Sequence, residues 1–211
     1  MKKLKGLFFR DFAEDYIPEV IKETWIEKLY DPYIKKDMVV AEVGANIGIF
    51  TLWAYQHASK IYAFEPSEQH FETLTHMLAF NDMLDKVTPQ KLALSNENTK
   101  TKFYHSGNTT SFSLSDAVSN GEFEEVECVD IEVMFKDIPH IDLLNVDIEG
   151  FECRVFASEE FERVAPKIDT IICEWHTWSG ITVSQMEAMF KDRGYKTKML
   201  KTEAVVIAAT K

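Results

Sequence analysis

Hydrophobic residues in this chain are concentrated in short strand-length runs that alternate with stretches of helical spacing. These mainly apolar runs lie at residues 38–43, 60–64, 87–94, 141–146 and 168–173. Runs of this length are typical of strands buried on both faces of a parallel sheet. The stretches with helical spacing lie at residues 47–57, 67–81 and 183–193, and a further helix opens at 151–156. The alternation predicts an α/β fold with parallel strands and helices on both faces of the sheet.

The end of the chain departs from this alternation. Two apolar runs, at 195–200 and 204–209, are separated by only three residues. A parallel return needs a connection of about a dozen residues or more, so these runs are predicted to form an antiparallel hairpin. The complete sheet therefore has seven strands, is mostly parallel and finishes in a C-terminal antiparallel hairpin.

Two segments fit the alternation less well. Residues 18–30 are predicted to form an amphipathic helix, with Pro18 in its first turn, that covers the sheet or acts as a lid over a ligand. Residues 95–125 are rich in Asn, Ser, Thr and Gly and predict a hairpin or loop excursion. The run 126–131 is either a further edge strand or the start of a connection. We expect an N-terminal helical cap region over 1–37 and one domain over 38–211.

Composition narrows the choice of partners. The 211 residues carry a formal net charge of -12, so the average surface repels nucleic acid and anionic lipid. No apolar stretch approaches the length of about 20 residues that crosses a bilayer. The three cysteines are odd in number and widely spaced, which favours a reducing, cytoplasmic location over a structural zinc site. We expect no nucleic acid or membrane partner.

The first candidate site follows the two opening strands. Gly44 and Gly48 flank a tight strand-to-helix turn, and Glu65 lies 21 residues after Gly44 at the end of the second strand. Glycines allow a ligand to approach the backbone, and an acid at this spacing accepts hydrogen bonds from ribose hydroxyls. The middle glycine of a dinucleotide-binding G-x-G-x-x-G motif is replaced by Asn46. This pattern predicts a pocket for a nucleoside without pyrophosphate.

The second candidate site is acidic. Asp147 and Glu149 follow the strand 141–146, and Glu174 and His176 end the strand 168–173. In open α/β sheets the carboxyl ends of the strands hold the ligand, so we expect Asp147 to face it. Alternatively, Asp147 caps the helix that opens near Phe151 and Glu149 is a solvated acid of its first turn. His176 is either a general base or a hydrogen-bonded loop residue, and together the four side chains suit a divalent cation.

Three motifs together resemble one family. The segments 43–48 (Val-Gly-Ala-Asn-Ile-Gly), 64–66 (Phe-Glu-Pro) and 147–152 (Asp-Ile-Glu-Gly-Phe-Glu) are similar, in order and spacing, to those of FkbM methyltransferases. The resemblance covers roughly residues 38 to 176. It implies a Rossmann-like class I methyltransferase fold and S-adenosylmethionine as cofactor. Two positions depart from the family pattern, where Glu42 replaces an Asp and Asn145 replaces a Lys.

The resemblance assigns roles by position. It implies that the cofactor is bound by Glu42, Gly44, Ala45, Asn46, Gly48, Glu65, Pro66 and Asp147. The acceptor would be oriented and deprotonated by Asp147, Glu149 or His176 during transfer of the methyl group to a hydroxyl of a small, sugar-like or secondary-metabolite acceptor. The polar stretch 105–120 is expected to line the acceptor site or to form solvated turns. The alternatives are an NAD-dependent oxidoreductase and a non-catalytic nucleoside-binding scaffold of the same fold.

Overall fold

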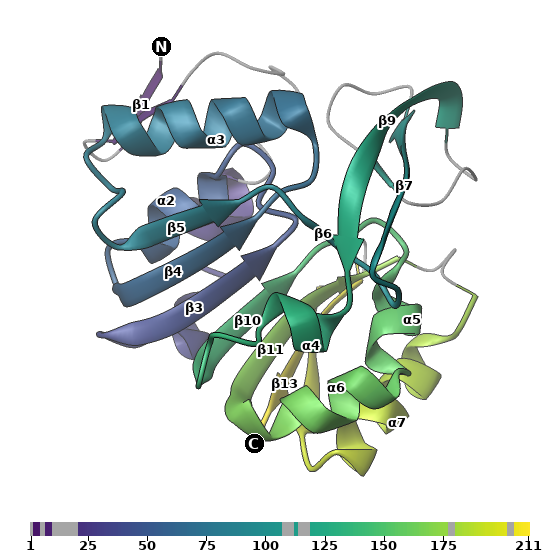
Figure 1. Cartoon of the computed structure of the whole chain (residues 1–211). Helices are drawn as coiled ribbons and strands as arrows, with labels where there is room; N and C mark the ends of the chain where they lie inside the picture. Colours follow the sequence, from purple (N-terminus) through teal and green to yellow (C-terminus); the bar gives the residue numbers. More distant parts are fainter. Residues whose placement is uncertain are drawn as a thin grey trace.

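A seven-stranded sheet forms the centre of the structure, a computed structural model that describes residues 2–4, 7–9, 21–106, 112–113, 119–176, 180–201 and 205–211 (Figure 1). Its strands are β3 (Met38–Val43), β4 (Ala58–Phe64), β5 (Val87–Gln90), β10 (Ile141–Val146), β11 (Ile168–Trp175), β12 (Lys196–Lys201) and β13 (Val205–Thr210). The order is β12-β13-β11-β10-β3-β4-β5. All neighbours from β5 to β11 are parallel, whereas β13 runs antiparallel to β11 and β12. The predicted fold class is confirmed.

The strand order reverses direction at the middle of the sheet. From β3 the chain adds β4 and β5 on one side and then returns to place β10 and β11 on the other. The crevice between the carboxyl ends of β3 and β10 is therefore a topological switch point, where open α/β sheets bind their ligands. Gly44 directly follows β3 and Asp147 directly follows β10.

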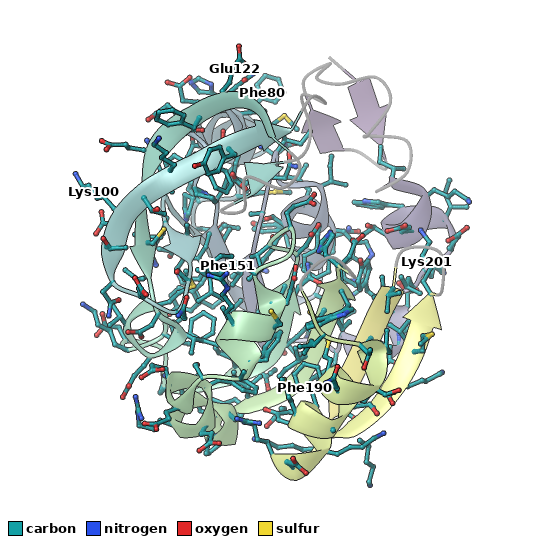
Figure 2. All side chains as sticks on the ribbon, turned by 90° about the vertical axis from the view of Figure 1, so that its right-hand side faces the viewer. Phe80, Lys100, Glu122, Phe151, Phe190 and Lys201 are labelled. Atoms are coloured by element: carbon teal, nitrogen blue, oxygen red, sulfur yellow. The ribbon has the colours of Figure 1, made fainter. Side chains whose placement is uncertain are left out.

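Helices cover both faces of the sheet. One face packs against α2 (Ile49–Ala54), α3 (Glu68–Phe80) and η1 (Lys22–Ile26), and the other packs against α4 (Ile131–Met134), α5 (Glu152–Phe156), α6 (Glu159–Val164) and α7 (Val183–Asp192). Side chains alternate between the faces along β3, so Val40 lies on the α2 face and Ala41 on the opposite face. On that opposite face the ring of Phe190, which Figure 2 labels, meets the ring of Phe156 edge to face with their centroids 4.9 Å apart.

Local sequence sets the ends of the longer helices. Ser67 caps α3 by accepting a hydrogen bond from the backbone N–H of His70, as the sequence predicts. Thr182 and Gln185 form a capping box at the start of α7, and Gly194 follows this helix with φ +86°. The helix α2 is shorter than the predicted 47–57 because Asn46 and Gly48 occupy the left-handed region, which delays its first turn.

A second sheet extends away from the main one (Figure 1). It contains β6 (Ala93–Leu94), β7 (Thr99–Ser106), β8 (Phe112–Ser113) and β9 (Ser119–Val129), in the order β6-β9-β7-β8. The prediction of one strand over 87–94 was wrong: β5 belongs to the main sheet and β6 to the second sheet. β5 holds Pro89, which an edge strand tolerates because it is paired on one side only.

This second sheet, which we call the arm, confirms the hairpin alternative for residues 95–125 and corrects the prediction for residues 126–131. The excursion is a hairpin, in which β7 and β9 pair antiparallel, and residues 126–129 belong to β9 rather than to an edge strand of the main sheet. The arm has a small core of Ala93, Phe103, Val126 and Cys128, while Lys100 and Glu122 project from its outer surface (Figure 2). An 11-residue strand that is polar on one face has no strong hydrophobic signature, so the sequence pattern missed it.

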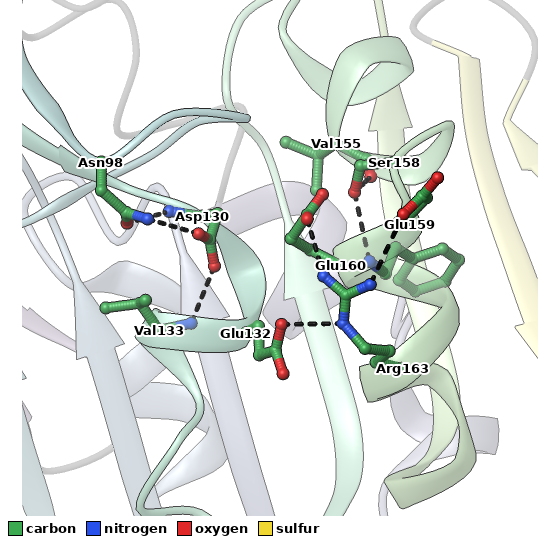
Figure 3. Close-up of polar contacts among 10 residues, drawn as sticks. Asn98, Asp130, Glu132, Val133, Val155, Ser158, Glu159, Glu160 and Arg163 are labelled. Carbon is green, nitrogen blue, oxygen red and sulfur yellow. Dashed lines mark hydrogen bonds and ion pairs between the residues drawn. The ribbon is translucent and has the colours of Figure 1, made fainter.

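Polar contacts join the arm to the helical layer (Figure 3). Asn98 donates to Asp130 at 2.5 Å and accepts from its backbone N–H at 3.0 Å. The other carboxylate oxygen of Asp130 accepts from the N–H of Val133 at 2.8 Å and so caps α4. In α6, Arg163 binds Glu132 of α4 at 2.9 Å.

The N-terminal region is only partly described. A two-stranded ladder pairs β1 (Lys2–Leu4) with β2 (Leu7–Phe9), which the sequence did not predict. The predicted continuous helix over 18–30 is wrong in its described part: η1 is a single π-helical turn, Lys28 has φ +55°, and a 3-10 turn η2 (Asp31–Tyr33) follows. Residues 18–20 lie outside the described part, and the boundary at residue 37 stays a prediction. Within the described residues, none of the helices is both long and apolar enough to span a membrane.

Candidate active site

The turn after β3 is held against the end of β10. Gly44 has φ +85°, and a Cβ atom at this position would lie 1.8 Å from the carbonyl oxygen of Asp147. The N–H groups of Gly44 and Ala45 both donate to the carbonyl of Phe64, at 3.0 and 2.9 Å, and the N–H of Asp147 donates to the carbonyl of Val43 at 3.0 Å. The backbones after β3, β4 and β10 are therefore in direct contact, and only glycine fits at position 44.

Glu65 joins this turn from the end of β4. Its side chain is buried, Oε2 accepts from the N–H of Asn46 at 2.7 Å, and Oε1 accepts from the N–H of Ser67 at 2.9 Å. The Nδ1 atom of His70 lies 3.9 Å from Oε1. Burial raises the pKa of Glu65 to about 7, although both backbone hydrogen bonds lower it. The carboxylate of Glu65 is thus bound directly to the glycine turn by one hydrogen bond.

These residues line a cleft at the switch point that encloses about 550 Å³ of empty space, part of it open to solvent. Six of the residues predicted from the sequence lie in its walls: Gly44, Asn46, Glu65, Pro66, Asp147 and Glu149. The sequence placed them at the carboxyl ends of three different strands, and the structure brings them together.

The cleft also has walls that the sequence did not predict. They comprise His70 together with the apolar residues Leu92, Ala93, Leu94, Phe103 and Ile148. Three of them, 92–94, follow the third parallel strand, so the rule that located Asp147 could also have found them. Phe103 belongs to the arm, and no sequence signal connects it with this cleft.

Three predicted cofactor residues do not line the cleft. The carboxylate of Glu42 faces α2, where it accepts a hydrogen bond from the hydroxyl of Thr51, because the side chains of β3 alternate between faces. Burial raises the pKa of Glu42 to about 8, although the bond from Thr51 lowers it. Ala45 is buried inside the turn, and a Cβ on Gly48 would contact the side chain of Leu74. These residues support the turn from behind, and any contact of theirs with a cofactor stays a prediction.

The acidic candidates form one cluster with His176. Its Nε2 atom lies 3.3 Å from Glu149 Oε2 and 3.9 Å from Asp147 Oδ1. Phe151, which makes no side-chain cap, occupies the N-cap position of α5, so Asp147 does not cap this helix. Glu149 has φ +53°, a left-handed conformation that aims its side chain at the same point. The carboxylate of Glu174 contributes charge to the same region.

A residue that the sequence analysis did not single out holds the histidine in place. The side chain of Glu152 is fully buried, and its Oε1 lies 2.8 Å from Nδ1 of His176. The same oxygen accepts from the N–H groups of Ile148 and Gly150 at 3.3 and 3.1 Å. The third acidic position of the segment 147–152 therefore anchors the imidazole and shapes the loop after β10.

Burial and neighbouring charges shift the pKa values of the acids and of the histidine in this cluster. Burial and the nearby Glu174 and Glu149 raise the pKa of Asp147 well above its usual range. Burial disfavours the charged imidazole of His176, but its hydrogen bond to Glu152 and the surrounding carboxylates raise its pKa to about 9. At neutral pH the imidazole is protonated and faces carboxylates at both nitrogens, so it is poorly suited to remove a proton. Most of the predicted acceptor stretch 105–120, namely residues 107–111 and 114–118, lies outside the described part, as do residues 177–179 after His176.

Several known proteins of similar sequence or structure are methyltransferases. The chain is 26% identical to the methyltransferase sdnD of Sordaria araneosa over 83% of this chain and 81% of that protein. A methyltransferase FkbM from Methylobacillus flagellatus matches its fold with a TM-score of 0.60 at 13% identity, over 95% of this chain and 56% of that one. A precorrin-6y C5,15-methyltransferase from Geobacter metallireducens matches with a TM-score of 0.54 at 13% identity, over 97% and 94%. The M. capricolum TrmK structure, which contains S-adenosylhomocysteine, matches with a TM-score of 0.53 at 13% identity, over 87% and 67%.

The family model agrees with these similarities and with the motifs around the cleft. The model of the methyltransferase FkbM domain matches residues 42–197, which include the glycine turn, Glu65, the segment 147–152 and His176. This match spans well over half of the chain, and the protein therefore belongs to the FkbM methyltransferase family.

Proposed function

We propose that this protein binds S-adenosylmethionine in the cleft and transfers its methyl group to a hydroxyl of a small acceptor, sugar-like or of secondary-metabolite type. The observation that carries the proposal is the bond between Glu65 and the glycine turn, which puts a carboxylate and a ligand-accessible backbone on the same cavity. Each oxygen of Glu65 accepts one backbone N–H and keeps a lone pair for a ribose hydroxyl. Membership of the FkbM family supports this cofactor over NAD.

The walls of the cleft suit the remaining parts of the cofactor. Leu92, Leu94 and Phe103 offer an apolar surface to the adenine ring beside Glu65. At the other end, the turn at Gly44 and the backbone of Asp147 leave room for the amino acid part. The sulfonium group then lies toward Asp147 and Glu149, where negative charge favours a cation.

The chemistry requires mainly alignment. The acceptor oxygen attacks the methyl carbon, a C–O bond forms, and the C–S bond breaks with its electron pair going to sulfur, which leaves S-adenosylhomocysteine. The hydroxyl proton passes to the carboxylate of Asp147, whose raised pKa suits this role, with Glu149 beside it. His176, held by Glu152, positions these carboxylates. Most of the rate gain comes from holding the two reacting atoms in line.

Calorimetry and an activity screen test the proposal. S-adenosylmethionine and S-adenosylhomocysteine should each bind with one-to-one stoichiometry, whereas NAD should not bind. A panel of hydroxylated sugars and secondary metabolites, incubated with methyl-labelled cofactor, should yield at least one labelled ether. Binding of NAD without the sulfonium ligand would refute the cofactor assignment. Cofactor binding with no turnover on any acceptor would favour a non-catalytic scaffold.

A further inference from the structure

We propose that Asp147, Glu149 and His176 form a binding site for one divalent cation, with Mn²⁺ as the best-suited ion. One ligand atom from each residue lies within 4.8 Å of the other two. Ligands at about 2.1 Å and right angles in an octahedral site are about 3 Å apart. The measured separations of 3.3 Å (Glu149 to His176) and 3.9 Å (Asp147 to His176) need only small side-chain movements to reach this geometry.

Asp147 contributes an observation that is independent of the clustering. Its Oδ1 atom is buried and has no hydrogen-bond partner among the described residues. A buried carboxylate oxygen without a partner is costly, by about 1–3 kcal/mol or more for a charged group. This oxygen is the one that faces Nε2 of His176, so the unsatisfied atom points into the proposed site. A coordinated cation would satisfy it.

The histidine is oriented as a metal ligand. Its Nδ1 atom lies 2.8 Å from the carboxylate of Glu152, which is itself fixed by two backbone N–H groups. Because a carboxylate only accepts hydrogen bonds, Nδ1 keeps its proton, and a bound ion displaces the second proton of the imidazolium from Nε2, the atom that faces Asp147 and Glu149. Metal-binding histidines characteristically donate their second N–H to a carboxylate in this way.

The charge of the region also favours a cation. Four carboxylates, of Asp147, Glu149, Glu152 and Glu174, influence one another around a single imidazole. Lys201, which lowers the pKa of Glu174, is also ion-paired with Glu23 of η1. Two carboxylates with one imidazole match the preferences of Mn²⁺ better than those of a soft, thiolate-seeking ion.

A second cluster of the same composition provides a comparison. His140, Asp142 and Asp169 lie at the opposite edge of the sheet, with His140 Nε2 at 3.4 and 3.1 Å from the two acids. Here the histidine side chain is 47% exposed. Solvent satisfies such groups without an ion, so this cluster is a matched control rather than a second site.

The position of the site suggests what the ion would do. Asp147 and Glu149 line the cleft where the proposed methyl transfer would occur. A cation held there would orient the acceptor hydroxyl and lower its pKa, so that the proton leaves more readily. This role rests on the proposed function, whereas the ion site itself does not.

Titration with Mn²⁺ alone, without cofactor or acceptor, tests the site. Electron paramagnetic resonance follows the loss of the free-ion signal, and the wild-type protein should bind one Mn²⁺ per chain. H176Q and E149Q should each weaken binding at least tenfold, and removal of the anchoring acid in E152Q should weaken it by about 10- to 100-fold. H140Q should bind Mn²⁺ as the wild type does. Thermal unfolding checks that each variant is folded. If H176Q does not fold, E149Q still tests the site, because Glu149 is partly exposed.

The outcomes separate the two proposals. Saturable binding that H176Q or E149Q removes and H140Q keeps would support the site even if S-adenosylmethionine does not bind. The absence of saturable Mn²⁺ binding by the folded wild type would overturn it, and so would equal losses in H176Q and H140Q. If the ion binds but its removal by chelation leaves methyl transfer unchanged, the catalytic role is wrong and the site remains.

Discussion

The substitution E65Q tests the cofactor pocket with the least change of shape. Both carboxylate oxygens of Glu65 accept backbone N–H groups, from Asn46 and from Ser67. A glutamine has one oxygen and one NH₂ group, so one of these N–H donors must then face another donor. The amide also removes one of the two acceptors proposed for the ribose hydroxyls.

The expected magnitudes differ for binding and for folding. A hydrogen bond to a charged group contributes about 1.5–3 kcal/mol, so losing one of the two ribose contacts should weaken cofactor binding by roughly 10- to 150-fold. Folding should change much less. Removing a charge whose pKa is raised from 4.5 to about 7 relieves about 3 kcal/mol at alkaline pH, at 1.36 kcal/mol per pKa unit. The mismatched N–H group costs about 1–3 kcal/mol, so the two effects nearly offset each other.

Calorimetry at pH 8 measures the affinity of E65Q for S-adenosylhomocysteine, and thermal unfolding measures the change in its stability. The control is E72Q, which removes the same charge from an exposed position in the following helix α3. It should leave the affinity for S-adenosylhomocysteine unchanged. A loss of less than threefold in E65Q, with the protein folded, would show that Glu65 does not hold the ribose.

The remaining predictions concern protonation, the glycine turn and the apolar wall. Glu65 must be ionised to accept two hydroxyls, and its pKa is about 7, so the affinity of the wild type for the cofactor should fall by up to tenfold per pH unit below pH 7. Calorimetry of E65Q should show no such dependence of the affinity on pH. G44A should lower the free energy of unfolding by about 2–5 kcal/mol, because the new Cβ adds left-handed strain and overlaps the carbonyl of Asp147. G194A has nearly the same φ but open space around it, so it should cost only about 1–2 kcal/mol. Equal shifts in Tm would contradict the contact between the ends of β3 and β10. F103L should weaken cofactor binding roughly 5- to 30-fold, because the adenine loses its stacking partner. The control F123L changes a 47% exposed ring of the arm and should leave the affinity unchanged. Equal cofactor affinities of the two variants would show that the adenine binds elsewhere.

The main sheet could be predicted because its signals are local and repeated. Buried strands appear as apolar runs, and a connection of three residues excludes a parallel return, so the order of elements and the final hairpin followed from spacing alone. The arm could not be predicted in this way. Its strand β9 carries Glu122, Glu124, Glu125 and Glu127, and its pairing with β7 is a long-range choice that no local pattern reveals. The split after β5 was missed for the same reason, because only Lys91 and Leu92 separate β5 from β6 and no turn signal marks the change of sheet.

The site shows the same division. The strand-end rule alone predicts that the glycine turn, Glu65 and Asp147 lie at one edge of the sheet. It could not distinguish Glu42, whose face follows from the register of β3, from residues that line the cleft. Nor could it show that Glu152 anchors His176. An acid in the first turn of a helix is common because it interacts favourably with the helix dipole, so its presence alone indicates no further role. Contacts between side chains depend on three-dimensional geometry that spacing does not encode.

The acids at this edge of the sheet carry an electrostatic cost when they are ionised. Burial raises the pKa of Glu42 to about 8 and of Glu65 to about 7, and it raises the pKa of Asp147 and Glu174 as well. An acid whose pKa is higher in the folded state contributes stability below its unfolded pKa, near 4.5, and that stability is lost as pH rises through the folded pKa. At the neutral to alkaline pH where these carboxylates are ionised, the fold therefore retains charges that burial disfavours. Hydroxyl donors on Glu65 and positive charge near Asp147 reduce this penalty, so the same ligands that the proposed reaction requires should also stabilise the protein most strongly where it is otherwise weakest.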